Sequence, residues 1–205
     1  ETILTLFRDP KLTLSQEQLE EKSPLEWFEE GKVGMITGTR ALVLGLRRTG
    51  LSAARYLDRK DLTVRIADTR VNPPGVDALR ANVPAAELRT GAFSSSLLDD
   101  VAQVVISPGL SLQEPVVRAA RERGCPVVGD IELFAREALA PIAAITGTNG
   151  KSTVTTLVAE LANAGGRRAV AGGNLGDPAL DLLARPTPDL YVLELSSFQL
   201  ETTRS

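Results

Sequence analysis

Histidine is absent from this sequence of 205 residues, and cysteine occurs once, at Cys125. Because no imidazole is present, these residues alone cannot complete a mechanism that requires a histidine base or a histidine metal ligand. A single cysteine cannot form an internal disulfide, which is typical of proteins in a reducing compartment. We therefore expect a cytoplasmic protein without an internal disulfide.

Strong net charge and long apolar segments are lacking as well. The 23 basic and 26 acidic residues give a net charge of −3 at pH 7, so charge gives no reason to expect a nucleic-acid partner. No apolar run approaches the length of a membrane span, and the first residues do not form a signal peptide. The sequence therefore predicts neither a nucleic-acid partner nor a membrane partner.

Short β-rich runs alternate with helical patterns from residue 41 onward. This alternation is typical of parallel βαβ units and of an α/β fold with a doubly wound sheet. We expect a Rossmann-like domain with a parallel sheet over residues 36–140 and the start of a second α/β domain over residues 141–205. The expected strands are 41–46, 63–68, 86–91, 101–109 and 125–130 in the first domain, and 141–147, 167–174 and 190–197 in the second.

The first 35 residues differ from the rest of the chain. Their segment 14–32 is acidic and has Trp27 and Phe28 as its only aromatic residues, and Met35 lies directly before the first expected strand. We interpret residues 1–35 as an N-terminal extension of unknown role, such as a non-native fusion remnant that takes no part in the chemistry. The alternative is an arm that packs on the first domain.

The stretch ITGTNGKST (145–153) follows an apolar run and precedes a helical pattern. Glycines in such a loop let backbone N–H groups surround phosphate oxygens, while the lysine offsets phosphate charge and the next hydroxyl reaches Mg²⁺. Ile145 occupies the place of the motif's first glycine, although Gly147 supplies flexibility within the loop. The alternative is a chance Gly-Lys-Ser turn, which the flanking strand and helix disfavour. We therefore predict a P-loop-type ATP-binding domain, with an ATP site made of Gly147, Thr148, Asn149, Gly150, Lys151, Ser152 and Thr153.

Glu194 ends an apolar strand that we expect to lie in the same sheet as the strand before this loop. A carboxylate at that position can hold Mg²⁺ opposite the loop hydroxyl, as phosphoryl transfer requires. We therefore predict Ser152 and Glu194 as metal ligands, and Lys151 and Glu194 as catalytic residues. The alternative is a glutamate that faces water at the end of its strand. Asn174 lies among glycines beside the expected cleft, although Gly-Asn is also ordinary turn chemistry.

The motif GLRRTG (45–50) follows the first expected strand and opens the next helix. It is similar to a dinucleotide-binding fingerprint, but Arg47 stands where the second glycine lets a pyrophosphate approach the backbone. The pattern favours a nucleotide ligand other than NAD, and the alternative is an ordinary βα turn with a capping aspartate. Further polar turns at strand ends are DTR, with Asp68, Thr69 and Arg70, and SPG, with Ser107, Pro108 and Gly109.

Seven motifs occur in a fixed order: GLRRTG, DTR, SPG, GDIELF (129–134), ITGTNGKSTVTTL, GGNLG (172–176) and YVLELSSFQLETT (191–203). Together they resemble the muramyl ligases of peptidoglycan synthesis over about residues 36–205. GTNGKST alone also fits other muramyl ligases and the folylpolyglutamate synthetases. GDIELF together with LELSSFQLE is more specific and resembles the branch of the family that adds D-glutamate.

The resemblance implies a cytoplasmic, monomeric, ATP-dependent acid–amino-acid ligase of three domains, with ATP and Mg²⁺ as cofactors. Its first domain would bind the uridine diphosphate of UDP-N-acetylmuramoyl-L-alanine, its central domain ATP, and its third domain D-glutamate. ATP would phosphorylate the alanyl carboxylate. The amine of D-glutamate would then attack the acyl phosphate, and phosphate would leave. Such a ligase serves cell-wall biogenesis and, through it, cell shape and division.

When the family's functional residues are carried over position by position, the resemblance implies the same ATP-binding loop at 145–153 and the same metal ligand, Glu194, as the motifs do. It places UDP instead of NAD at the first site. The substrate-binding residues that it implies are Thr49, Asp68, Thr69, Arg70, Asn174, Ser196 and Gln199. We add Ser107, Pro108 and Gly109 to this predicted set, because ligands bind at the carboxyl ends of strands in open α/β sheets.

Two features depart from the family pattern. Arg47 replaces a usual glycine, so a guanidinium would contact the diphosphate at that position. The sequence ends at Ser205, before the places where the resemblance puts a metal-binding histidine, a carbamylated lysine and the C-terminal domain. We therefore expect a fragment that is incomplete for catalysis, with three central-domain strands that leave a sheet edge in need of a cover.

Two alternatives come from other classes of protein. A dinucleotide-binding oxidoreductase domain would bind NAD(P) at GLRRTG but would leave the phosphate loop without a role. A noncatalytic binding module would use residues 1–35 to dock a partner. Separate titrations with UDP-N-acetylmuramoyl-L-alanine, ATP and NADH distinguish these classes.

We predict that this polypeptide binds a nucleotide or UDP-sugar but has no ligase activity by itself, because the family's later ligands lie beyond Ser205. The measurement is the release of ADP from ATP in the presence of Mg²⁺ and UDP-N-acetylmuramoyl-L-alanine, with and without D-glutamate. ADP release that depends on D-glutamate would contradict this expectation.

Overall fold

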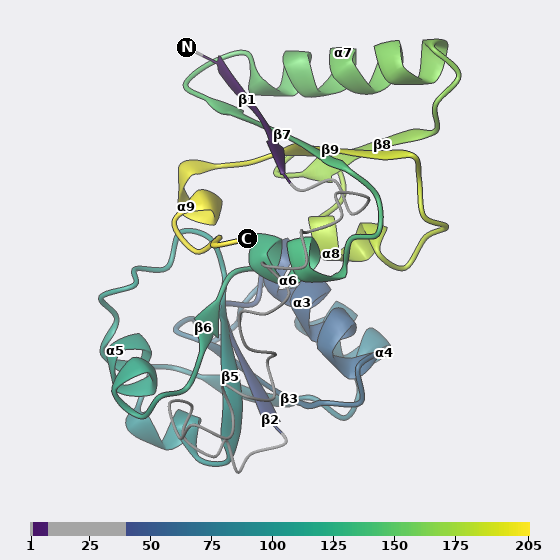
Figure 1. The fold of residues 1–205 in the computed structure, drawn as a ribbon. Coiled ribbons are helices and arrows are strands. Elements are labelled where there is room, and N and C mark those ends of the chain that lie inside the picture. Colours follow the sequence, from purple (N-terminus) through teal and green to yellow (C-terminus); the bar gives the residue numbers. More distant parts are fainter. Residues whose placement is uncertain (1, 8–39) are drawn as a thin grey trace, which may run out of the picture.

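Two α/β lobes make up the structure, a computed structural model that describes residues 2–7 and 40–205 (Figure 1). The first lobe surrounds a five-stranded sheet whose strands lie within residues 40–128, and the second surrounds a four-stranded sheet made of Thr2–Phe7 and of strands within residues 142–194. The expectation of an α/β fold with parallel sheets is confirmed. Most of the predicted extension, residues 1–35, lies outside the described residues, so its origin and role stay predictions.

The sheet of the first lobe is parallel throughout, in the order β4-β3-β2-β5-β6. Its central strand β2 is apolar without alternation, and residues 41–44 are fully buried because helices cover both faces. The elements are β2 (Arg40–Leu44), α3 (Arg48–Asp58), β3 (Thr63–Asp68), α4 (Val76–Asn82), β4 (Glu87–Thr90), the 3-10 helix η1 (Ser95–Leu98), β5 (Val101–Ile106), α5 (Pro115–Glu122), β6 (Val127–Val128) and α6 (Asp130–Glu137).

The sheet of the second lobe has the order β1-β7-β9-β8, in which the last three strands are parallel. The strand β1 (Thr2–Phe7) pairs antiparallel with β7 and covers one edge of this sheet. Thus the described part of the N-terminal arm lies on the second lobe, whereas β8 is the opposite edge strand among the described residues. The other elements are β7 (Ile142–Gly147), α7 (Lys151–Ala164), β8 (Ala169–Gly173), α8 (Ala179–Leu182), β9 (Leu190–Glu194) and α9 (Ser197–Leu200).

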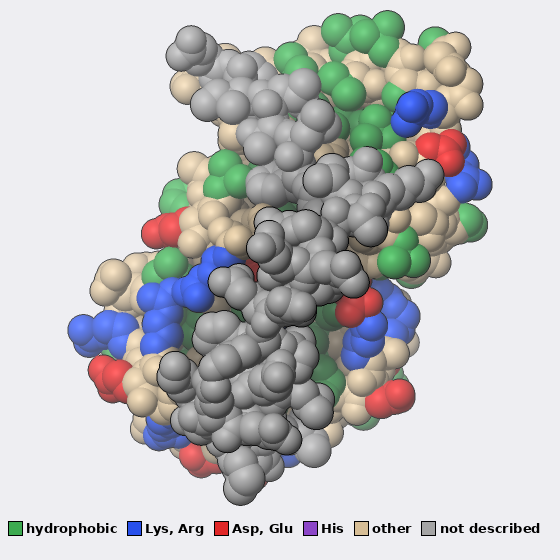
Figure 2. Space-filling view, in the orientation of Figure 1, with side chains coloured by type: hydrophobic (Ala, Val, Ile, Leu, Met, Phe, Trp, Pro, Cys, Tyr) green, Lys and Arg blue, Asp and Glu red, His purple; other side chains and the backbone are tan. Residues whose placement is uncertain are grey.

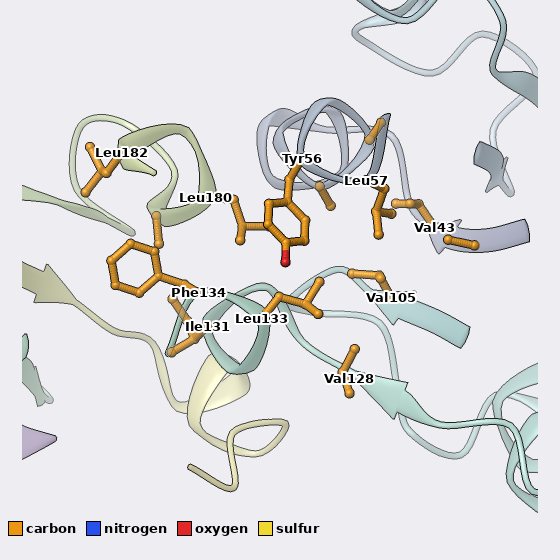
Figure 3. Packing of buried hydrophobic residues seen from close by; sticks show 14 of the residues in the cluster. Val43, Tyr56, Leu57, Val105, Val128, Ile131, Leu133, Phe134, Leu180 and Leu182 are labelled. Carbon is orange, nitrogen blue, oxygen red and sulfur yellow. The ribbon is translucent and has the colours of Figure 1, made fainter. Parts of the chain in front are cut away.

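The two lobes share one hydrophobic core, in which α6 lies between them (Figure 3). Phe134 on α6 is fully buried, and its ring meets Tyr191 of β9 edge-on, with ring centroids 4.9 Å apart. Leu180 and Leu182 of α8 belong to the same cluster as the side chains of α3 and β2. The position of one sheet relative to the other is therefore set by close packing.

Polar contacts between α3 and α8 supplement this packing. Asp181 accepts hydrogen bonds from Ser52 Oγ at 2.8 Å and from the Arg55 guanidinium at 2.5 Å. Arg59 Nη2 donates to the carbonyl oxygen of Leu180 at 3.4 Å. Asp181 and Arg55 are largely shielded from water. Their ion pair therefore attracts α3 to α8 and also helps to fix the orientation of the two helices.

Hydrophobic side chains gather over α7 at the top of Figure 2. Leu157 and Leu161, one helical turn apart on α7, are 50% and 63% exposed. No helix within residues 40–205 combines the length and the hydropathy needed to cross a bilayer.

Replacing Phe134 by alanine should lower the free energy of unfolding by about 3–5 kcal/mol, because it empties the core at the junction of the lobes. Urea unfolding followed by circular dichroism measures the change. Phe198→Ala is the matched control, since Phe198 is 58% exposed and its loss should cost less than about 0.5 kcal/mol. Equal effects of the two substitutions would contradict a shared core at this junction.

Candidate nucleotide and substrate sites

The loop between β7 and α7 presents an open helix N-terminus. Gly150 is the N-cap of α7 and adopts a left-handed conformation with φ of 72°, which favours glycine. Within the part of the chain that the structure describes, no side-chain cap is found there, and the first N–H groups and the positive end of the helix dipole could meet an anion. Ile145, which occupies the position of the motif's first glycine, is buried within β7 opposite Glu194. That position is therefore part of a strand in this protein.

Lys151 folds back over this loop, and its Nζ donates to the carbonyl oxygen of Gly147 at 2.9 Å. Thr148 and Asn149 in this loop and Thr153 in the first turn of α7 are exposed. The loop therefore brings a cation and backbone donors together where phosphate oxygens could replace the Gly147 carbonyl as acceptor. These are the residues that the sequence predicts for the ATP site.

Glu194 is the buried carboxylate of the second lobe, 4% exposed at the end of β9. Its Oε2 accepts a hydrogen bond from Ser152 Oγ at 2.6 Å, and its Oε1 accepts one from Asn174 Nδ2 at 2.9 Å. The strand β9 lies between β7 and β8, so its end meets the loops that follow both neighbours. The predicted pair of Ser152 and Glu194 is thus in direct contact, while Asn174 holds the same carboxylate from the other side.

The donor set around Glu194 fits Mg²⁺. This cation prefers oxygen ligands and is commonly held by one or two carboxylates, with phosphates and water in its other positions. Ser152 and Glu194 supply a hydroxyl and a carboxylate within contact distance. No group of three or more His, Cys, Asp or Glu side chains suited to a metal occurs in residues 40–205, so phosphate oxygens and water would complete the coordination.

Ser196 and Gln199 fasten α9 to α6. Ser196 is the N-cap of α9 in a capping box with Gln199, and Gln199 Nε2 donates to Asp130 Oδ2 at 3.1 Å. Gln199 is 3% exposed, and burial raises the pKa of Asp130 to about 6. Among the described residues, Asp130 Oδ1 has no hydrogen-bond partner. The side chain of Gln199 therefore faces a helix here, and its predicted contact with substrate stays a prediction.

A cavity of about 420 Å³ lies at the carboxyl ends of the strands in the first lobe. The structure brings together there all the predicted substrate residues of this lobe, and it adds some that the sequence did not single out. Phe93 is the most informative addition, because it closely follows β4 at the same sheet edge and the strand-end rule could have found it. The lining residues are Gly45, Arg47, Thr49, Asp68, Thr69, Arg70, Phe93, Ser107, Pro108, Gly109 and Leu110.

Asp68 uses both carboxylate oxygens within the protein. It accepts from Leu46 N at 2.7 Å and from the backbone and guanidinium of Arg70 at 2.5 to 3.0 Å. The Arg70 guanidinium is the main reason why the pKa of Asp68 falls to about 2. Asp68 therefore stabilises the turn after β2 through Leu46 N and orients the Arg70 side chain at the cavity. Both of its carboxylate oxygens already accept hydrogen bonds within the protein.

The start of α3 touches the turn after β2. A Cβ atom on Gly50 would lie 1.9 Å from the Gly45 carbonyl oxygen, so only glycine allows this approach. The same close packing of helix and strand is the role of the third glycine in dinucleotide-binding folds. Arg47 lines the cavity and brings a cation to the place where such folds have their second glycine.

The sequence and the fold are both similar to known proteins. Residues 39–129 match the family model described as "Mur ligase MurD-like, N-terminal domain". The UDP-N-acetylmuramoylalanine--D-glutamate ligase of Nitrosococcus oceani is 55% identical over 163 residues, which are 80% of this chain and 36% of that relative. The enzyme of the same name from Pseudomonas aeruginosa is 54% identical, over 78% of this chain and 36% of the relative. The chain thus spans just over a third of the length of these relatives.

A solved structure supports the fold alone. It is the UDP-N-acetylmuramate:L-alanyl-gamma-D-glutamyl-meso-diaminopimelate ligase of Neisseria meningitides, with a TM-score of 0.50 and 20% sequence identity. The match covers 77% of this chain and 52% of that structure. The family match ends at residue 129, just before α6, and the predicted domain boundary near Ala140 stays a prediction.

Asp68 should make the stability of the fold depend on pH. Its folded-state pKa of about 2 lies below the ordinary 3.8, so its contribution is complete above about pH 4 and is lost as the pH falls through 2. We expect Asp68→Asn to lower the free energy of unfolding at pH 7 by roughly 1–2 kcal/mol, allowing for solvent around Arg70. Urea unfolding at several values between about pH 2 and pH 7 measures the free energy of unfolding of both proteins.

The control for this prediction is Asp58→Asn, at the exposed end of α3. This variant should keep the wild-type dependence of stability on pH. If Asp68→Asn also kept it, the assignment of that dependence to the pair of Asp68 and Arg70 would be wrong.

Proposed function

Because the chain belongs to the Mur ligase family, we propose that it binds UDP-N-acetylmuramoyl-L-alanine and ATP for the addition of D-glutamate. The name of these relatives contains both the sugar-linked acceptor and the amino acid. The activity is that of the named relatives, and this chain spans just over a third of their length. The observation that carries the proposal is Glu194, whose carboxylate meets the Ser152 hydroxyl beside an uncapped helix N-terminus.

The second lobe would hold the triphosphate of ATP. The Lys151 ammonium would donate to phosphate oxygens instead of to the Gly147 carbonyl oxygen. The backbone N–H groups at the start of α7 would donate to further phosphate oxygens. Ser152 and Glu194 would hold Mg²⁺, which when bound offsets the charge on the phosphoryl group in transfer. Asn174 keeps the Glu194 carboxylate oriented by its hydrogen bond to Oε1.

The first lobe would hold the uridine diphosphate. Arg47 and Arg70 bring two guanidinium groups to its cavity, and a guanidinium can pair with phosphate oxygens through two parallel hydrogen bonds. Phe93 and Pro108 add apolar surface to the same cavity, against which the flat face of a base could pack. Asp68 contributes by fixing Arg70 and the turn after β2.

The chemistry follows from the weakness of a carboxylate as an acyl donor. Transfer of the terminal phosphoryl group of ATP to the alanyl carboxylate gives an acyl phosphate and ADP. The amine of D-glutamate then forms a bond to the carbonyl carbon, and phosphate leaves with the electron pair of the C–O bond while the nitrogen loses a proton. Lys151 and the α7 N-terminus would act on the first step, where they offset charge and align the phosphates.

Replacing Lys151 by methionine should weaken the binding of Mg²⁺–ATP by about 10- to 100-fold, since it removes a charge-assisted hydrogen bond to phosphate. Isothermal titration calorimetry measures the dissociation constant. Lys60→Met is the matched control, because Lys60 lies on the first lobe and pairs with Glu137 at 2.6 Å. Unchanged binding by Lys151→Met would refute the assignment of the phosphate site.

A second variant tests the metal in the same experiment. Glu194→Gln should bind ATP with the same affinity in the presence and the absence of Mg²⁺, whereas the wild type should bind more tightly when Mg²⁺ is present. If the variant retained the full effect of Mg²⁺, Glu194 would not be a metal ligand.

A further inference from the structure

The two arginines of GLRRTG have different environments. Arg47 lines the cavity of the first lobe. Arg48 reaches the second lobe, where its Nη2 donates to the Gly176 carbonyl oxygen at 2.7 Å. One turn of backbone therefore touches both the candidate diphosphate site and the other lobe.

The acceptor of Arg48 belongs to a closed loop, Gly172 to Asp177, which we call the glycine loop. Gly173 N donates to the carbonyl oxygen of Asp177 at 2.8 Å, which closes the loop on itself. Asn174 N donates to the backbone carbonyl of Glu194 at 2.8 Å, and Asn174 Nδ2 donates to the carboxylate at 2.9 Å. The glycine loop therefore sets the position of Glu194 through both its backbone and its side chain.

Hydrogen bonds, together with the backbone of the glycine loop between Gly176 and Asn174, thus join the two sites. This connection begins at the turn with Arg48, passes through the glycine loop to Asn174 and Glu194, and ends at Ser152 in the phosphate loop. The hydrogen bonds that Ser52 and Arg55 of α3 and Arg59 just after it make with this lobe go to Asp181 and Leu180 of α8, and none of them ends on the glycine loop itself.

We propose that Arg48 is a positioning residue that couples the uridine diphosphate site to the metal–nucleotide site. A ligand that orders the turn at residues 45–50 also orders the glycine loop, and with it the Glu194 carboxylate. The second ligand then binds a carboxylate that is already ordered, so each ligand strengthens the binding of the other by the same factor. This inference rests on the proposed function, because it takes UDP and Mg²⁺–ATP as the two ligands.

The test is a binding cycle on the whole 205-residue chain. Isothermal titration calorimetry gives the dissociation constant of the Mg²⁺ complex of AMP-PNP, an ATP analogue that resists hydrolysis, with and without saturating UDP. UDP is chosen because it is small enough to occupy the cavity of the first lobe alone. We expect UDP to tighten nucleotide binding by about fivefold or more in the wild type.

Arg48→Met should reduce this factor to about one while each ligand alone still binds, because coupling is lost without loss of either site. Arg48→Lys should restore part of the factor, since an ammonium can also donate to the Gly176 carbonyl. Arg59→Met is the matched control and should keep the wild-type factor, because Arg59 contacts the same lobe at Leu180. Thermal unfolding of each variant establishes that it is folded, and stability alone would not change the coupling factor.

The outcomes separate the inference from the proposed function. If the wild type binds both ligands without coupling, or if Arg48→Met keeps the coupling, the role of Arg48 is refuted and the proposed function stands. If Arg59→Met loses the coupling to the same extent, the interface as a whole carries it and the role of Arg48 is again refuted. If the wild type binds neither UDP nor Mg²⁺–AMP-PNP, the proposed function fails and this inference fails with it.

Discussion

The pairing of the Glu194 carboxylate is the interaction on which the second lobe depends. A buried carboxylate is costly unless hydrogen-bond donors satisfy it, and Glu194 is almost fully buried at the end of the middle parallel strand. The Ser152 hydroxyl and the Asn174 amide supply those donors from the loops after the two neighbouring strands. The need to pair one carboxylate thereby fixes the phosphate loop and the glycine loop relative to each other, and it places a potential metal ligand between them.

The junction between the lobes extends this constraint to the first sheet. Phe134 and Tyr191 belong to one core with α3 and α8, so the sheets cannot reorient without opening close-packed contacts. Both candidate ligand sites lie in loops at the carboxyl ends of parallel strands, where ligands bind in open α/β sheets. The hydrogen bond from Arg48 to Gly176 joins one such set of loops to the other. The two ligands that we propose, a uridine diphosphate and ATP, would therefore bind on loops that are joined to each other by this hydrogen bond.

Most of the fold follows from local patterns in the sequence. The apolar run at 41–46 and the β-rich run at 63–68 predict strands, and β2 and β3 occupy those places because both faces of their sheet are covered. The phosphate loop was recognisable because Gly150, Lys151 and Ser152 are adjacent in the chain. The cavity of the first lobe was largely predictable for a similar reason, since its polar residues directly follow their strands.

The remaining features depend on partners that are far apart in the sequence. The contacts of Gln199 with Asp130 and of Arg48 with Gly176 join residues separated by 69 and 128 positions, and no local pattern indicates them. Asp68 illustrates the same limit, because the sequence predicts it to be a substrate-binding residue, whereas the structure shows that its carboxylate already accepts hydrogen bonds from Leu46 and Arg70. Sequence position thus indicates which residues lie together at the strand ends, but only the packed structure shows which of their polar groups already have hydrogen-bond partners.

The central claim is that Glu194 and the phosphate loop form one site for a metal-bound nucleotide. A crystal structure of the chain with Mg²⁺ and AMP-PNP tests it most directly. The account predicts Mg²⁺ at about 2.0–2.1 Å from oxygens of Glu194 and Ser152, with the Lys151 ammonium moved from the Gly147 carbonyl to a phosphate oxygen. A nucleotide bound elsewhere, with the hydrogen bonds of Glu194 and Lys151 unchanged, would contradict it.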